Sequence, residues 1–212
     1  MEHAFFPPEA RAPVASKKEQ SMRIVILGVG ALGSTTAVLC RALDATLVFV
    51  DFDKVESKNL LAQAFVKQSL GKNKAEALKV QLLNFYGTKA EAFGVRVTKD
   101  NVDQLTKDAA LIVDCFDNAE SRRIVSEHAR AKNLPLVHAA ISGDGSFGLV
   151  RWDARFAPDA EDHAGQATCE GGEHLPMIGL LSATLARTIQ DFVTKQEQRD
   201  SMVGLKSITV TS

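Results

Sequence analysis

Three glycines near the start of the chain have the spacing of a phosphate-binding loop. Gly28, Gly30 and Gly33 lie in "ILGVGALGSTTAVL" as G-x-G-x-x-G. In such a loop the first glycine permits a tight turn, the second lets the backbone approach a phosphate, and the third allows close packing of helix on strand. Amides at the helix start then face the anion. The pattern predicts nucleotide binding, with a glycine-rich turn that binds nothing as the alternative.

A second group of polar residues follows the next apolar run. Asp51 lies about 20 residues beyond the glycines, where a carboxylate usually accepts hydrogen bonds from ribose hydroxyls. A solvated strand end is the plainer interpretation. Up to this point NAD, FAD and ATP are all compatible. Asp53, Asn59 and Gln63 come next, and the two amides are uncharged donors suited to phosphate or ribose oxygens.

Five ordered motifs, taken together, resemble the family of ubiquitin-activating enzymes and their bacterial relatives ThiF, MoeB and HesA. The resemblance runs from about residue 22 to 195. It includes "CEGGEHLPMIGLLSATLARTIQDF", which is similar to the family's cysteine-containing loop and final helix. The matching positions are Gly28/Gly30/Gly33, Asp51/Asp53/Val55, Asn59/Leu60/Gln63, Gly71/Lys74/Ala75 and Asp114/Asp117/Asn118/Arg122.

The resemblance implies ATP and Mg²⁺ as cofactors and an adenylyltransferase as the activity. Such an enzyme activates the C-terminal glycine carboxylate of a small ubiquitin-like or sulfur-carrier protein, or of a peptide, and releases pyrophosphate. Lys74 would neutralise triphosphate charge, and Asp117 would be the Mg²⁺ ligand together with phosphate oxygens. Asn118 and Arg122 would join the nucleotide site, and the protein would form a homodimer. Catalysis would consist mostly of positioning and charge stabilisation.

Each of these residues also has a simpler interpretation. Asp117 and Asn118 could cap a helix. Lys74, on an amphipathic helix, could be a surface lysine. Arg122 and Arg123 begin a helix, where the dipole does not favour them, and Arg122 could be an ordinary surface charge or could contact phosphate or a partner.

Three cysteines occur, and none forms a C-x-x-C pair. We expect Cys40 to pack in the core and Cys115 to be an inert residue of a buried strand. Cys169 lies in a glycine-rich loop, where relatives carry a cysteine that can form a thioester or persulfide with the carrier. His163 and His174 flank it and could bind a metal with it, although no regular ligand spacing supports this.

One position departs from the family pattern. Where relatives have S-N-L-x-R-Q, this chain reads "KNLLAQ", so Ala62 stands at the arginine position and Lys58 at the serine position. The arginine contacts ATP phosphates in relatives, and losing such a donor costs about 10²–10³ in rate. Lys58, Lys72 or Arg122 could compensate. Otherwise the chain would be a non-catalytic protein that binds nucleotide or a carrier.

The elements that must position these residues alternate between strand and helix. Apolar runs predict strands at 22–28, 45–53, 90–98, 109–118, 135–143 and 145–153, and helical periodicity predicts helices at 31–44, 72–86, 100–108, 119–133 and 175–196. Asp100 is the expected N-cap of the helix at 100–108, and 204–212 is a candidate edge strand. This order predicts an α/β fold, Rossmann-like and doubly wound, with a mostly parallel sheet and antiparallel strands on its C-terminal side.

Composition limits the functional classes. The formal charge of −1 gives no general attraction to nucleic acid or to an anionic membrane, which disfavours a tRNA-modifying relative. The residues after Asp51 disfavour an NAD oxidoreductase. No run of 18 apolar residues occurs, and the N-terminus lacks the order of a secretory signal. We therefore expect a flexible arm at 1–21, one ATP-binding domain at 22–212, and a cytoplasmic location.

Overall fold

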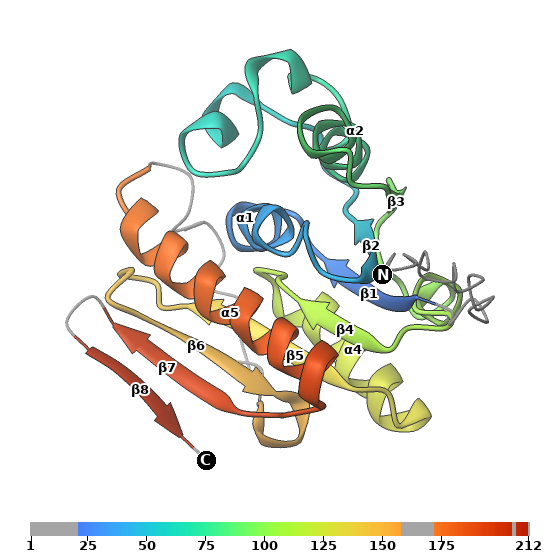
Figure 1. The fold of residues 1–212 in the computed structure, drawn as a ribbon, viewed down its shortest axis with the longest axis vertical. Coiled ribbons are helices and arrows are strands. Elements are labelled where there is room, and N and C mark those ends of the chain that lie inside the picture. Colours follow the sequence, from blue (N-terminus) through green and yellow to red (C-terminus); the bar gives the residue numbers. More distant parts are fainter. Residues whose placement is uncertain (1–20, 158–171, 205–206, 212) are drawn as a thin grey trace, which may run out of the picture.

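The computed structural model describes residues 21–157, 172–204 and, for the backbone alone, 207–211. The expected arm at 1–21 lies almost wholly outside these ranges. The described elements form one sheet with helices on both faces (Figure 1). None of the helices in the described ranges has the length and apolar character needed to span a membrane.

The sheet has eight strands in the order β3-β2-β1-β4-β5-β6-β7-β8. Strands β1 to β5 pair with one another in parallel, whereas β6, β7 and β8 are antiparallel additions. The strand bounds are β1 Met22–Leu27, β2 Ala45–Val50, β3 Ala90–Phe93, β4 Leu111–Asp114, β5 Leu136–Ile141, β6 Phe147–Trp152, β7 Asp200–Gly204 and β8 Ser207–Thr211. The mostly parallel sheet with its antiparallel C-terminal side is confirmed.

Two apolar cores lie on opposite faces of the sheet. The larger joins α1, α2 and α5 to the sheet, and the smaller joins α3 and α4 to the other face. Figure 1 shows α5 and α1 together in front of the sheet and α4 behind it. The helices are α1 Ala31–Leu39, α2 Lys74–Tyr86, α3 Val102–Leu105, α4 Ala119–Lys132 and α5 Leu175–Lys195, with short 3₁₀ turns η1 Ser57–Leu61, η2 Lys67–Ser69 and η3 Asp153–Arg155.

Successive side chains of β1 and β2 point alternately to the two faces of the sheet, so each strand contributes to both cores. Ile24 and Ile26 belong to the larger core, while Val25 and Leu27 between them belong to the smaller one. Successive side chains of a strand point to opposite faces, so a strand covered on both faces is apolar throughout. The parallel strands therefore place their carboxyl ends at one edge of the sheet, where the loops bearing the predicted site residues begin.

Several expected boundaries were wrong. The first helix ends at Leu39, since Cys40 is its C-cap, and the third strand ends at Phe93. The helix expected at 100–108 is only Val102–Leu105, and its N-cap position is Asn101, not Asp100. Asn101 uses its side-chain oxygen to accept the Thr98 amide, 2.8 Å away, so the turn is fixed one residue later than expected.

Candidate active site

The glycine loop has the geometry that its spacing predicts. Gly28 has φ +81° and lies against the carbonyl of Cys115, so both a side chain and an L-residue backbone are disfavoured there. A Cβ on Gly33 would lie 2.0 Å from the Gly28 oxygen, whereas a Cβ on Gly30 would meet nothing within 4 Å. The tight turn therefore requires Gly28, and close packing requires Gly33. Gly30 leaves open space at the start of α1.

Asp51 is held directly against the glycine loop. Its Oδ2 accepts the Val29 amide at 2.8 Å and its Oδ1 accepts the Asp53 amide at 2.9 Å. Burial raises the pKa of Asp51, although the two amides and the Lys74 charge oppose that shift. The carboxylate is thus fixed beside the space above Gly30, and each oxygen keeps a further lone pair for a hydroxyl donor.

Lys74 is not the surface lysine of the simpler interpretation. It begins α2 and is buried, and its Nζ lies 3.2 Å from Oδ2 of Asp53, which is half-exposed. The Asn73 side chain caps the helix at Glu76 N and also donates to the Asp51 carbonyl at 2.8 Å. The start of α2 is thereby tied to the end of β2, which places one ammonium at the carboxyl edge of the sheet.

The segment after β2 brings Asn59 and Gln63 to the same side of the molecule. Asn59 is buried, and its Oδ1 accepts the Glu56 amide at 2.8 Å in a capping box of η1. Gln63 has a buried Oε1 with no hydrogen-bond partner. Ser34 of α1 accepts the Ala64 amide at 3.0 Å, which joins this segment to the helix that carries the glycine loop.

Ala62 lies inside the larger core. Its side chain is 3% exposed and belongs to the cluster that includes Leu32, Val55 and Phe65. It supplies no donor, and an arginine here would have to extend out of an apolar cluster to reach phosphate. Ala62 therefore differs from the arginine of the family pattern in two ways: it carries no charge, and its side chain packs in the core.

The loop between β4 and α4 carries the predicted Mg²⁺ ligand. Asp117 is exposed at the carboxyl edge of the sheet. Asn118 is the N-cap of α4, and its Oδ1 accepts the Ser121 amide at 2.9 Å. The capping role proposed as an alternative thus belongs to Asn118, while the Asp117 carboxylate is left for other ligands.

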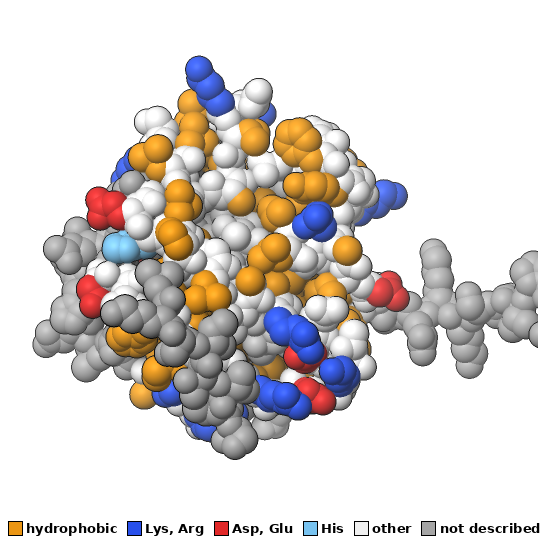
Figure 2. Space-filling model, turned by 60° about the vertical axis from the view of Figure 1, so that its left-hand side comes forward, with side chains coloured by type: hydrophobic (Ala, Val, Ile, Leu, Met, Phe, Trp, Pro, Cys, Tyr) orange, Lys and Arg blue, Asp and Glu red, His pale blue; other side chains and the backbone are white. Residues whose placement is uncertain are grey.

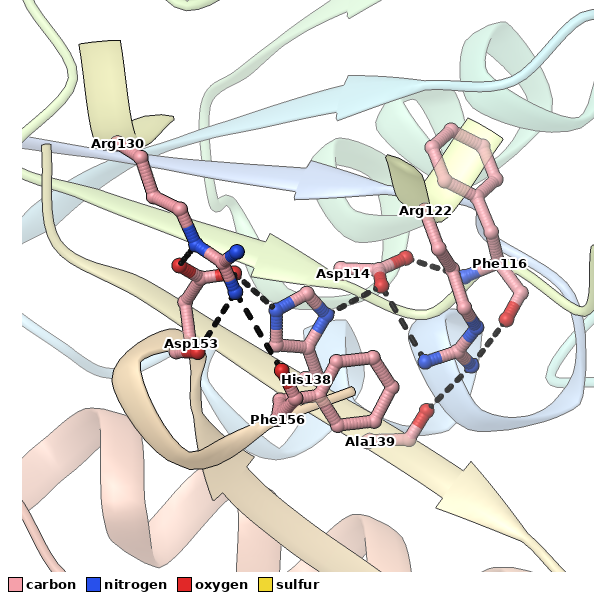
Figure 3. Close-up of polar contacts among 8 residues, drawn as sticks. All are labelled: Asp114, Phe116, Arg122, Arg130, His138, Ala139, Asp153 and Phe156. Carbon is pink, nitrogen blue, oxygen red and sulfur yellow. Dashed lines mark hydrogen bonds and ion pairs between the residues drawn. The ribbon is translucent and has the colours of Figure 1, made fainter. Parts of the chain in front are cut away.

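Arg122 is buried, so it is not an ordinary surface charge. Its Nη1 lies 3.3 Å from Oδ2 of Asp114, and its Nη2 donates to the Ala139 carbonyl at 2.9 Å and to the Phe116 carbonyl (Figure 3). Both terminal nitrogens face protein oxygens. A contact between Arg122 and phosphate stays a prediction that this arrangement does not favour.

A buried histidine beside Asp114 was not predicted. His138 of β5 is 0% exposed; its Nδ1 lies 2.6 Å from Asp114 Oδ2 and its Nε2 lies 3.1 Å from Asp153 Oδ1. Phe156 stacks on the ring with centroids 3.9 Å apart. Arg130 binds the far side of Asp153 at 2.5 Å. A polar residue inside the apolar run "PLVHAAI" was the one available signal.

Of the three cysteines, Cys40 and Cys115 lie in the part of the chain that the structure describes. Burial raises the pKa of Cys40 to about 12, and its side chain packs in the larger core as expected. Cys115 follows β4 directly, and burial also raises its pKa. Cys169 and His163 lie outside the described residues. His174 is the N-cap residue of α5, and its ring fills the space beside Gly145.

The molecule also has a cavity away from the glycine loop. It has a volume of about 430 Å³ and lies beside α5 and β7. Figure 2 shows apolar side chains spread across one face, with lysine and arginine side chains both among them and at the margins. Among the residues lining the cavity are Leu180, Ala183, Thr184, Arg187 and Ser201. None of the predicted site residues that the structure describes belongs to this lining.

A glycine loop between β1 and α1, with Asp51 fixed against it directly after β2, is the arrangement of a Rossmann-like fold. The chain matches the ThiF family over residues 7–206. It therefore belongs to the ThiF family, and the resemblance inferred from its motifs is confirmed.

The relatives of this chain are activating enzymes. It is 34% identical over 144 residues to the sulfur carrier protein ThiS adenylyltransferase of Bacillus subtilis, covering 65% of this chain and 42% of that protein. It is 35% identical over 125 residues to the SAMP-activating enzyme E1 of Haloferax volcanii, covering 57% and 46%. The chain thus spans less than half the length of these curated relatives.

Solved structures share the fold at low identity. The ATP complex of Escherichia coli MccB aligns with a TM-score of 0.71 and 18% identity, over 90% of this chain and 63% of that one. PaaA aligns with a TM-score of 0.68 and 17% identity, over 90% and 62%. These likenesses confirm the Rossmann-like architecture.

Proposed function

We propose that this protein is an ATP- and Mg²⁺-dependent adenylyltransferase that activates the C-terminal carboxylate of a small ubiquitin-like or sulfur-carrier protein, or of a peptide. The observation that carries the proposal is the Asp51 carboxylate fixed on the Val29 amide beside the open space at Gly30. The named adenylyltransferases among the relatives support it, and the ATP complex of MccB supports ATP as the nucleotide.

The reaction needs a nucleophile, a leaving group and charge stabilisation. A carboxylate oxygen of the substrate tail attacks the α-phosphorus of ATP, the bond from that phosphorus to the bridging oxygen breaks, and pyrophosphate leaves. The attacking group is already an anion, so no side chain has to accept a proton. The protein's contribution is to hold the two reactants in line.

The residues at the carboxyl edge divide this work. The α1 amides beyond Gly30 receive phosphate oxygens, and Asp51 holds the ribose. Lys74 balances the charge of the departing pyrophosphate. Asn59 and Gln63 offer side-chain amides to the nucleotide.

The donor set also suits Mg²⁺. Mg²⁺ is usually held by one or two carboxylates together with substrate phosphates, and Asp117 is an exposed carboxylate at this edge. When bound, the ion would neutralise phosphate charge. Asn118 holds the start of α4, which keeps Asp117 at the edge.

The proposed enzyme also has an oligomeric state and a protein substrate. We propose a homodimer, because the exposed apolar side chains of Figure 2 are of the kind that a second subunit covers. We also propose a cytoplasmic protein with no nucleic-acid or membrane partner, in which Cys169 can take part in carrier transfer. Light scattering of the purified protein tests the dimer.

A second function is favoured by Ala62. Because this side chain is buried among apolar residues, the phosphate-binding arginine of relatives has no substitute at its own position. The chain could then bind nucleotide or a carrier without catalysis.

ATP–pyrophosphate exchange separates these two functions. Candidate carriers ending in Gly-Gly are incubated with the protein, ATP, Mg²⁺ and labelled pyrophosphate. Carrier-dependent incorporation of label into ATP supports the adenylyltransferase. A protein that binds ATP and a carrier but exchanges no label supports the non-catalytic alternative.

A further inference from the structure

The charged residues around His138 form one continuous network of side-chain contacts, which extends from the first turn of α4 to its last turn. The order is Arg122, Asp114, His138, Asp153 and Arg130, in which cations and anions alternate (Figure 3). Both arginines belong to α4, eight residues apart. The carboxylates come from the end of β4 and from the turn after β6. This network therefore fixes α4 along its length against β4, β5 and the turn η3.

The two contacts of the imidazole bear on its protonation state. Nδ1 faces a carboxylate oxygen at 2.6 Å and Nε2 faces another at 3.1 Å. A carboxylate only accepts hydrogen bonds, and a neutral imidazole has only one N–H. Both contacts can be hydrogen bonds only if both nitrogens are protonated. Burial alone would lower the pKa of His138, but the bonds to Asp114 and Asp153 outweigh it and raise the pKa.

Asp114 links the His138 ring to the loop that carries Asp117, the predicted Mg²⁺ ligand. Its second oxygen, Oδ1, accepts the Phe116 amide at 2.9 Å. Arg122 closes the same turn from the other side through the Phe116 carbonyl. Asp117 is the next residue. The backbone that aims the Asp117 carboxylate is thus held by a carboxylate which is itself held by His138.

We propose that His138 is a doubly protonated positioning residue that orients Asp117 toward nucleotide-bound Mg²⁺ through Asp114. The inference rests on the proposed function, since it takes Asp117 as the Mg²⁺ ligand. Residues that orient a metal ligand from behind typically change metal affinity by about 10–100-fold when they are replaced. The charged groups that face the ring are Asp114 of β4 and Asp153 of η3, with Arg122 and Arg130 of α4 beyond them.

Nitrogen-15 NMR of the wild-type protein tests the protonation state. His128 is the matched control, because it is half-buried, lies on α4 and has its Nε2 2.9 Å from the Thr106 hydroxyl rather than from a carboxylate; burial lowers its pKa. We expect both ring nitrogens of His138 to show imidazolium shifts at pH 7.5, where His128 is neutral. A neutral tautomer of His138 at this pH would overturn the proposal.

Calorimetry of ATP binding tests the positioning role without any carrier. Each protein is titrated with ATP once in Mg²⁺ and once in EDTA, and the ratio of the two affinities gives the contribution of the metal. We expect His138→Gln to reduce this ratio by about 10-fold or more, with little change in EDTA, and His128→Gln to leave it unchanged. An equal loss in both conditions would indicate a purely structural role and would overturn the proposal, as would an unchanged ratio.

Asp117→Asn separates this inference from the proposed function. We expect it to abolish the gain from Mg²⁺. If it does so and His138→Gln does not, the positioning role is wrong while the metal ligand stands. If Asp117→Asn keeps the full gain, the metal assignment of the proposed function is wrong, and the positioning role with it.

Discussion

Oδ2 of Asp51 accepts the backbone amide of Val29 at 2.8 Å, so the acid at the end of β2 is tied to the glycine loop after β1. The bond joins two neighbouring parallel strands at the edge where their loops begin. Asp51 is 22 residues from Val29 along the chain. This bond explains how its carboxylate is held in a fixed place relative to Gly30. The ribose and phosphate positions of the proposed nucleotide site are therefore set together.

Replacing Asp51 should affect both binding and stability. In Asp51→Ala the buried Val29 amide loses its acceptor, which costs about 1–3 kcal/mol of unfolding free energy, and the ribose contact is lost. We expect a lower urea midpoint and weaker ATP binding by calorimetry. Asp53→Ala is the comparison, since Asp53 is half-exposed and accepts no amide from the loop. Unchanged ATP affinity in Asp51→Ala would remove Asp51 from the site.

Gly30 and Gly33 give opposite predictions for the same substitution. A methyl group on Gly33 would lie 2.0 Å from the Gly28 oxygen, so Gly33→Ala should destabilise the fold strongly. On Gly30 it would meet no protein atom within 4 Å, so Gly30→Ala should keep its melting temperature and lose ATP affinity because the methyl occupies phosphate space. Circular dichroism and ATP titration measure the two effects. Normal ATP binding by Gly30→Ala would place the phosphates elsewhere.

Lys74→Met should lower activity with little change in stability. The ion pair with the half-exposed Asp53 contributes little, and methionine fills similar space. Loss of the ammonium should reduce pyrophosphate exchange by about 10²-fold. Lys79→Met on the same helix is the control, since Lys79 forms an exposed pair with Glu76. Equal rates in the two variants would contradict the role of Lys74.

The parallel part of the sheet could be predicted from the sequence, because each of its strands is a run of apolar residues that are neighbours in the chain. Strand β7 escaped prediction, since "DSMVG" holds one core residue, Val203, and becomes a strand through its pairing with β6. His138 was missed for a related reason: its partners are 24 and 15 residues away. Nothing in the sequence places Asp114 and Asp153 on opposite sides of one ring.

Acid should weaken the contribution of Asp153 to stability. Burial alone would raise the pKa of this carboxyl, but hydrogen bonds from His138 and Arg130 lower it to about 2. A depressed folded-state pKa stabilises the protein above the unfolded value of about 3.9, and the effect is lost as pH falls toward 2. The gap in urea midpoint between wild type and Asp153→Asn should therefore shrink from pH 5 to pH 2.5. Parallel pH profiles would contradict this.

Ala62→Arg tests whether the missing arginine limits the nucleotide site. Ala62 is 3% exposed in the larger core, so a larger side chain should cost about 1–3 kcal/mol of unfolding free energy by overpacking. Ala62→Met adds similar bulk without charge and should cost about the same. If the guanidinium extends from the cluster to the phosphates, Ala62→Arg alone should bind ATP more tightly and exchange pyrophosphate faster than wild type. Equal ATP affinity in the two variants would show that this buried position cannot deliver a charge to the site.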